Sequence, residues 1–123
     1  MNAPASTPRD PLILTRKSNG VTTLMMNMPK RLNGWTMEMM EALKAALAVA
    51  TEDEETKALV LTGADPYYCA GVNLGATLRL GHPRELHGMI VQANEALFNT
   101  FLDFPKPILV AANGPAIGAS VTS

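Results

Sequence analysis

The sequence has little of several features that define other classes of protein. It contains one cysteine, which excludes an internal disulfide framework. None of its apolar runs approaches the ~20 residues that span a bilayer. Its formal net charge is -1, and no basic run extends beyond Lys30-Arg31, so nothing indicates binding to nucleic acid. These absences predict an ordinary soluble domain, or part of one, with neither a nucleic-acid nor a membrane partner.

The two ends of the chain differ in their expected structure. The first 11 residues contain three prolines and no apolar core segment, so residues 1–11 are expected to form a flexible tail. Ser123 follows Gly118 by only five residues, within the first turns of an expected helix and with no stop signal before it. Residues 12–123 are therefore expected to be the N-terminal part of a domain, in a truncated polypeptide.

Hydrophobic patterning in the first half of the chain predicts an α/β domain. A β-hairpin is expected from Leu12–Lys17 and Val21–Asn27, because the Asn19-Gly20 pair between them tolerates the positive φ angles of a tight turn. Thr36 is expected to cap a helix. The apolar stripe of this helix, spaced by three and four residues, is formed by Met40, Leu43, Leu47 and Ala50.

The second half of the chain continues with further strands and helices. Continuous apolar runs at 58–62 and 108–112 are typical of strands that are buried on both faces of a sheet. Between them a helix is expected from Pro83 to Phe104, ended by the prolines that follow. Its apolar residues are Met89, Ala93, Leu97, Phe98 and Phe101. Another helix is expected to begin after Gly118.

Two similar glycine-bearing turns follow these strands, at residues 68–74 and 113–120. Ligands of α/β sheets collect at the carboxyl ends of the strands, where small residues let a ligand approach the backbone. Backbone N–H groups at such turns can point at an oxygen that carries developing negative charge. The pair of turns therefore predicts a site with two N–H donors for an oxyanion.

Four motifs occur in one order along the chain, at 29–34, 58–63, 68–74 and 106–118. In this order they resemble the N-terminal half of the enoyl-CoA hydratase/isomerase, or crotonase, superfamily, from about Leu12 to the last residue. The resemblance implies an α/β fold, a crotonase-like spiral of repeated ββα units, of which this chain is the N-terminal portion. It also implies an acyl-CoA thioester as substrate, no separate cofactor, and a homo-oligomer, either a trimer or a hexamer.

The resemblance further implies roles for individual residues. The two oxyanion donors fall on the backbone N–H groups of Val72 and Ala119, each directly after a glycine. No metal ligand is implied. Two neighbouring cations suit the phosphates of CoA. The residues implied to contact the CoA thioester are Lys30, Arg31, Leu32, Ala70, Gly71, Asn73, Leu74 and Gly118.

One position departs from the hydratases of this family. Thr122 occupies the place of one of their two glutamates, and threonine cannot act as a carboxylate base at neutral pH. Moving a double bond needs only one acid/base group, and residues 113–122 are similar to the branch that converts β,γ-enoyl-CoA to α,β-enoyl-CoA. The expected activity is therefore that of an enoyl-CoA delta isomerase acting through a thioester enolate, with its carboxylate beyond Ser123.

Two other functions stay open on the residues alone. Residues 118–122 partly match the nucleophile elbow of a serine-type acyl or thioester hydrolase, with Ser120 as nucleophile, although the final glycine is missing. A non-catalytic acyl-CoA-binding or assembly module is the second alternative. Hydrolysis lost in Ser120→Ala would favour the hydrolase, whereas isomerisation that survives this substitution would favour the isomerase.

The remaining reactive side chains have ordinary explanations. Cys69 is expected to be a small buried residue, and His82 and His87 to lie on the surface near a helix start without binding a metal. Glu85 and Glu95 are expected on a solvated helix face. The expected compartment is cytoplasmic, with the peroxisome and the mitochondrion as alternatives.

Overall fold

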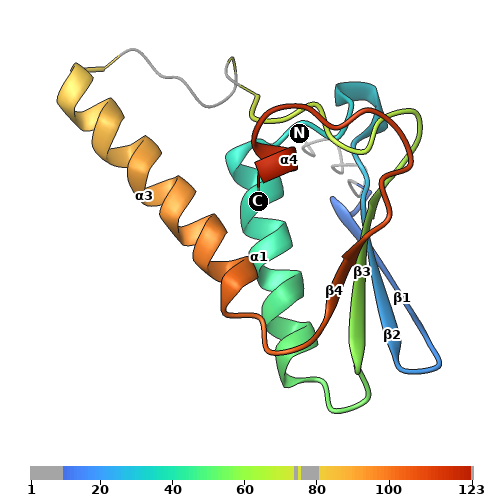
Figure 1. The fold of residues 1–123 in the computed structure, drawn as a ribbon. Helices are drawn as coiled ribbons and strands as arrows, with labels where there is room; N and C mark the ends of the chain where they lie inside the picture. Colours follow the sequence, from blue (N-terminus) through green and yellow to red (C-terminus); the bar gives the residue numbers. More distant parts are fainter. Residues whose placement is uncertain (1–9, 74, 76–80, 123) are drawn as a thin grey trace, which may run out of the picture.

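The computed structural model, which describes residues 10–73, 75 and 81–122, is an α/β structure built on one four-stranded sheet (Figure 1). The strands lie in the order β1-β2-β3-β4. Their bounds are β1 Ile13–Ser18, β2 Val21–Met26, β3 Ala58–Gly63 and β4 Ile108–Val110. The helices are the 3-10 helix η1 Pro29–Arg31, α1 Met37–Glu52, α3 Pro83–Leu102 and α4 Ala119–Thr122.

The expected hairpin is confirmed as β1 and β2, which pair antiparallel from Ile13↔Met26 to Ser18↔Val21. Its two-residue turn has φ angles of 51° at Asn19 and 80° at Gly20. Asparagine and glycine tolerate these left-handed angles better than other residues do, and a turn of this hand matches the twist of the strands. The Asn-Gly pair therefore sets the register of the first hairpin.

The other strands run parallel to β2, with Val21 paired to Ala58 and Leu59 paired to Ile108. Because β2, β3 and β4 point the same way, their carboxyl ends meet at one edge of the sheet. Helix α1 connects β2 to β3, and α3 lies between β3 and β4, as the sequence pattern predicts. The segments that leave the three carboxyl ends all emerge at this edge, next to α4 in Figure 1.

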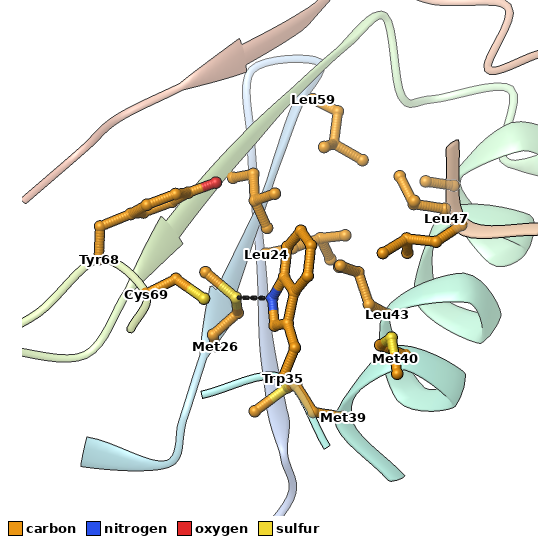
Figure 2. Packing of buried hydrophobic residues seen from close by; sticks show 13 residues of the cluster. Leu24, Met26, Trp35, Met39, Met40, Leu43, Leu47, Leu59, Tyr68 and Cys69 are labelled. Carbon is orange, nitrogen blue, oxygen red and sulfur yellow. Dashed lines mark hydrogen bonds between the residues drawn. The ribbon is translucent and has the colours of Figure 1, made fainter. Parts of the chain in front are cut away.

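Helix α1 covers the sheet with the predicted apolar stripe. Thr36 caps it as expected, because the Thr36 Oγ1 accepts a hydrogen bond from the Met39 N–H at 3.1 Å. Trp35 precedes the cap and is fully buried, with its Nε1–H donating to the Met26 sulfur at 3.4 Å (Figure 2). The buried core residues contributed by α1 are Met39, Met40, Leu43, Leu47 and Ala50.

The expectation that β3 and β4 are buried on both faces of the sheet is wrong for the described residues. In β3, the buried Leu59 and Leu61 alternate with half-buried residues, and β4 is an edge strand with Leu109 58% exposed. The long helix carries the five apolar residues noted in the sequence, of which only Leu97 is buried in α3. Figure 1 shows why, since α3 projects away from the sheet and approaches α1 only near its C-terminal end. A continuous apolar run does not by itself specify which neighbour will cover it.

An ion pair joins the first strand to the end of α1. The Lys17 ammonium lies 2.6 Å from the Asp53 carboxylate, which also accepts from the Thr56 hydroxyl at 2.6 Å. These two hydrogen bonds, the one from Lys17 first, lower the pKa of Asp53 to about 2. Its pKa is therefore lower in the folded chain than in the unfolded chain, so ionised Asp53 stabilises the fold.

The stability of the fold is expected to depend on pH through this pair. The pKa of Asp53 is about 2 in the folded chain and near 3.8 in the unfolded chain. The ion pair therefore contributes its full stability above pH 3.8, and this stability is lost as the pH falls toward 2. The free energy of unfolding in urea should be lower for Lys17→Met than for the native chain at pH 6, and this difference should shrink between pH 4 and pH 2. Lys44→Met removes the i,i+3 pair with Glu41, 2.6 Å apart, and is the matched control. A constant difference across that pH range would contradict the assignment.

Candidate functional site

Three segments meet at the edge where the parallel strands end. They are residues 27–36 after β2, residues 64–73 after β3 and residues 111–118 after β4. The middle segment makes backbone hydrogen bonds with each of the other two, and all three lie at the same end of the molecule in Figure 1. Both glycine-bearing turns found in the sequence belong to this group, so the structure brings them together.

The first glycine turn is held against the segment that follows η1. The Ala70 N–H donates to the Leu32 carbonyl at 2.9 Å, and the Trp35 N–H donates to the Gly71 carbonyl at 2.8 Å. The Asn73 N–H donates to the Trp35 carbonyl at 2.9 Å. These bonds align the two segments as a short parallel bridge between Trp35 and Val72.

This bridge determines the direction of the Val72 N–H. The Gly71 carbonyl points at Trp35, and it belongs to the same peptide group as the Val72 N–H. In a trans peptide the C=O and the N–H lie on opposite sides, so the Val72 N–H is directed away from Trp35. The predicted donor therefore points to the side of the first turn that is opposite Trp35.

The second glycine turn is held against the first. The Cys69 carbonyl accepts from the Ile117 N–H at 3.0 Å, and the Pro115 carbonyl accepts from the Tyr68 N–H at 3.1 Å. Gly71, with φ of 82°, approaches the second turn so closely that a Cβ built on it would lie 2.5 Å from the Ile117 carbonyl oxygen and 3.8 Å from the Gly118 Cα. The two turns are therefore in direct backbone contact.

Ala119 begins α4 directly after this contact. Gly118 adopts φ of 63°, and its carbonyl accepts from the Val121 N–H at 3.0 Å. The Ala119 N–H lies on the opposite side of the same peptide group, so it points out of the N-terminal end of α4. The structure thus places the two predicted donors, Val72 and Ala119, each one residue beyond a glycine of two turns that are in backbone contact. Their function as donors stays a prediction.

The residues predicted to bind CoA lie around the first turn. Lys30 and Arg31 are exposed in η1, and Leu32 is half-buried with φ of 54°. The Leu32 carbonyl links this short helix to Ala70, so the two cations stand on the segment next to the first glycine turn. Asn73 closes the bridge to Trp35, while Leu74 lies outside the described residues. Their contact with CoA stays a prediction of the family resemblance.

The side chain of Cys69, which belongs to the first turn, is fully buried in the hydrophobic core. Burial raises the pKa of this thiol, and the Gly71 N–H donates to its sulfur at 3.3 Å. A thiol with a raised pKa and no access to solvent stays protonated and is a poor nucleophile. The expectation that Cys69 is a small buried residue is confirmed, and Figure 2 shows it beside Tyr68 and Met26 in the core.

Two asparagines that sequence reasoning missed tie these segments together. The amide of the fully buried Asn33 donates to the Ala64 and Tyr67 carbonyls, both at 2.8 Å, and its oxygen accepts from the Met28 N–H at 2.8 Å. The Asn113 oxygen accepts from the Gly63 N–H at 3.1 Å. Each asparagine precedes a glycine in the sequence, but an Asn-Gly pair signals only a turn.

The histidines and acidic residues of α3 lie outside this group of segments. His82 is the N-cap of α3 and accepts from the Arg84 N–H at 3.3 Å, and His87 is exposed, as expected. Glu85 and Glu95 are also exposed on α3. Within the described ranges no three histidine, cysteine or acidic side chains lie together as metal ligands would. In the same part of the chain, no helix has the length and apolar character needed to cross a membrane.

Comparison with known proteins agrees with this architecture. A family model described as enoyl-CoA hydratase/isomerase matches residues 16–122. The chain belongs to the enoyl-CoA hydratase/isomerase family. It shares 37% identity over 111 residues with enoyl-CoA delta isomerase 2 of Rattus norvegicus, covering 89% of this chain and 28% of that protein. It is 36% identical over 112 residues to 1,2-epoxyphenylacetyl-CoA isomerase of Escherichia coli, covering 89% of this chain and 43% of that protein.

The crotonase fold is confirmed by solved structures of the family. An enoyl-CoA hydratase/isomerase from Xanthobacter autotrophicus Py2 superposes with a TM-score of 0.81 at 25% identity, covering 89% of this chain and 41% of that one. The chain therefore spans less than half the length of these relatives. This member of the enoyl-CoA hydratase/isomerase family carries the N-terminal portion of the crotonase fold. Within the family, its sequence is similar to the isomerase branch.

Proposed function

We propose that this chain forms the thioester-binding part of an enoyl-CoA isomerase. The observation that carries the proposal is the contact between two glycine turns, each followed by a backbone N–H whose direction is set by its own peptide group. Val72 and Ala119 would donate to the carbonyl oxygen of the bound thioester. Membership in the enoyl-CoA hydratase/isomerase family and the likeness to a delta isomerase support an acyl-CoA substrate.

The chemistry follows from stabilising negative charge on that oxygen. When a proton is removed from the carbon next to the thioester, the C–H electron pair forms a C=C bond to the carbonyl carbon. The π electron pair of the carbonyl moves to its oxygen, which becomes the enolate oxygen. Backbone donors aimed at this oxygen lower the barrier, because they interact more strongly with the enolate than with the neutral carbonyl. Return of the proton at the γ-carbon completes the shift of the double bond from the β,γ to the α,β position.

Thr122 favours isomerisation over hydration. Its side chain is exposed on α4, and its hydroxyl bonds the Ala119 carbonyl at 3.4 Å. A hydroxyl there cannot replace the glutamate that the paired-glutamate hydratases use. Isomerisation needs one acid/base group, for which we assign no residue of this chain. Assembly into a trimer or hexamer stays a prediction of the family resemblance.

The hydrolase alternative is not favoured, because the Ser120 hydroxyl is occupied by backbone groups. It accepts from the Ile117 N–H at 3.0 Å and lies 2.9 Å from the Ile117 carbonyl oxygen. A nucleophilic serine needs a neighbouring base that takes its proton, and these partners are amide groups. The binding-module alternative is separated from the isomerase by the experiment that follows.

Incubation of but-3-enoyl-CoA with the whole enzyme of which we propose this chain is part, and which would also supply the acid/base group, distinguishes the functions. We expect but-2-enoyl-CoA as the first product, detected by liquid chromatography and by deuterium incorporated at the γ-carbon in D₂O. The 3-hydroxy product alone would indicate hydration, and free CoA would indicate thioester hydrolysis. Binding of but-3-enoyl-CoA without any product would contradict an isomerase and support a non-catalytic module.

A further inference from the structure

We propose that Ser120 is a positioning residue that clamps the second glycine turn onto the first and so sets the spacing of the two oxyanion donors. This inference rests on the proposed function, because it concerns the placement of Ala119 relative to Val72. The resemblance to serine hydrolases draws attention to the Ser120 hydroxyl as a nucleophile. The geometry points to a different use of the same hydroxyl.

The Ser120 hydroxyl contacts both turns at once. It lies 2.9 Å from the Ile117 carbonyl oxygen and 3.3 Å from the Cys69 carbonyl oxygen, and it accepts from the Ile117 N–H at 3.0 Å. A hydroxyl has one proton to donate and two lone pairs that accept. It therefore accepts from the Ile117 N–H and donates to one of the two carbonyls, one of which belongs to the first turn.

Burial makes these bonds significant. Ser120 is 8% exposed and is the one buried residue of α4, whereas Val121 is 64% exposed. With little water to replace a lost partner, each missing bond leaves a backbone group less well satisfied. The hydroxyl is thus placed to connect turns that are 51 residues apart in the sequence.

The short α4 is oriented by contacts with the rest of the fold, among them the packing of Ala119 against the core and the bond from the Ser120 hydroxyl to the first turn. It contains four residues, about one turn, and a helix of this length is not stable by itself in water. Ala119, the predicted donor, is the residue directly before Ser120, and the partner carbonyl of Cys69 lies three residues before Val72. Loosening the clamp would let the two donors move relative to each other.

Catalysis by an oxyanion site is sensitive to such movement. A misplacement of about 1 Å can cost on the order of 10²-fold in rate, although the binding of the rest of the substrate is unaffected. A purely structural serine would instead lower the stability of the fold while leaving the site of the surviving folded molecules unchanged. The two roles therefore predict different results for a folded Ser120→Ala protein.

The direct test is infrared spectroscopy of bound butyryl-CoA labelled with ¹³C at the thioester carbonyl. This saturated probe reports hydrogen bonding to the carbonyl oxygen and cannot be isomerised. We expect the carbonyl band of the native complex to shift to lower wavenumber, and the shift to be at least halved in Ser120→Ala. The affinity for butyryl-CoA should change less than about threefold, and turnover of but-3-enoyl-CoA should fall about 10- to 100-fold with little change in KM.

Two further variants control for the loss of a hydroxyl. Thr51→Ala removes a hydroxyl that bonds the Leu47 carbonyl at 2.9 Å near the C-terminal end of α1, about 20 Å along the helix from its cap, and should leave the band unchanged. Ser120→Thr keeps the hydroxyl and should restore the shift. If Ser120→Ala does not fold, Ser120→Cys under reducing conditions replaces it, because a thiol is a weak donor of similar size.

The outcomes separate this inference from the proposed function. A full carbonyl shift and full turnover in folded Ser120→Ala would overturn the positioning role and leave the oxyanion site standing. No carbonyl shift in the native complex would overturn both. If the native protein releases free CoA and Ser120→Ala does not, Ser120 is a nucleophile instead.

Discussion

Replacing Ala119 with proline is expected to lower isomerase turnover about 10²- to 10³-fold, the effect of deleting one backbone donor from an oxyanion site. Proline has no N–H, yet the first position of a helix tolerates it, because an N–H there makes no bond within the helix. Ala119 is the first residue of α4. The substitution therefore removes the predicted donor and keeps the helix start.

Steady-state kinetics with but-3-enoyl-CoA would measure this loss, together with circular dichroism to show that the fold is intact. Turnover should fall while KM changes little, because the donor acts most strongly on the enolate. An amide-to-ester replacement at Ala119 deletes the same N–H without the proline ring and is the control for backbone distortion. Undiminished turnover in either folded variant would rule out the role assigned to Ala119.

Substituting Gly71 with alanine is expected to lower the free energy of unfolding by roughly 2–5 kcal/mol. Two costs add at this position. Gly71 has φ of 82°, which an L-residue adopts with strain, and its added Cβ would lie 2.5 Å from the Ile117 carbonyl oxygen. That oxygen belongs to the backbone of the second turn, so the clash is relieved only if the two turns separate.

Gly118→Ala is the matched comparison for this prediction. Gly118 has φ of 63°, a similar strain for alanine, but a Cβ built there meets no atom within 4 Å. Its substitution should cost only about 1–2 kcal/mol. Urea unfolding of both variants would measure the difference, which reports the contact between the turns. Equal destabilisation would show that the contact contributes nothing beyond backbone strain.

Both predictions concern one physical feature, the close backbone contact of two turns that follow different strands. In Figure 1 these turns lie at the edge where β2, β3 and β4 end. Hydrogen bonds from Trp35 on one side and Ile117 on the other hold the first turn in place. The site is built almost entirely from backbone groups, so side-chain chemistry gives little indication of it.

Local features of the fold could be predicted because their causes lie within a few residues. Asn19 and Gly20 favour the hairpin turn through their φ angles, and Thr36 caps α1 through the amide three residues later. The apolar stripe of α1 follows from the 3.6-residue period of a helix. The order of the four motifs was specific enough to indicate the family, which the comparisons confirm.

Tertiary structure decided the features that depend on distant partners. The sequence pattern predicted burial for β4, but burial requires a neighbour, and the described chain leaves Leu109 exposed. Phe98 on α3 is exposed as well. Asn33 and Ser120 appear in the sequence as a turn residue and a possible nucleophile. In the fold they hold together segments 31 to 51 residues apart.

The sequence by itself therefore determined the secondary structure, the family and the two glycine turns, since these follow from local conformational preference and motif order. Only the tertiary structure decided that Gly71 touches the Ile117 carbonyl and that Ser120 bridges both turns. A hydrogen bond between residues far apart in the chain has no periodic signature. It exists because parallel strands bring their carboxyl ends to one edge of the sheet.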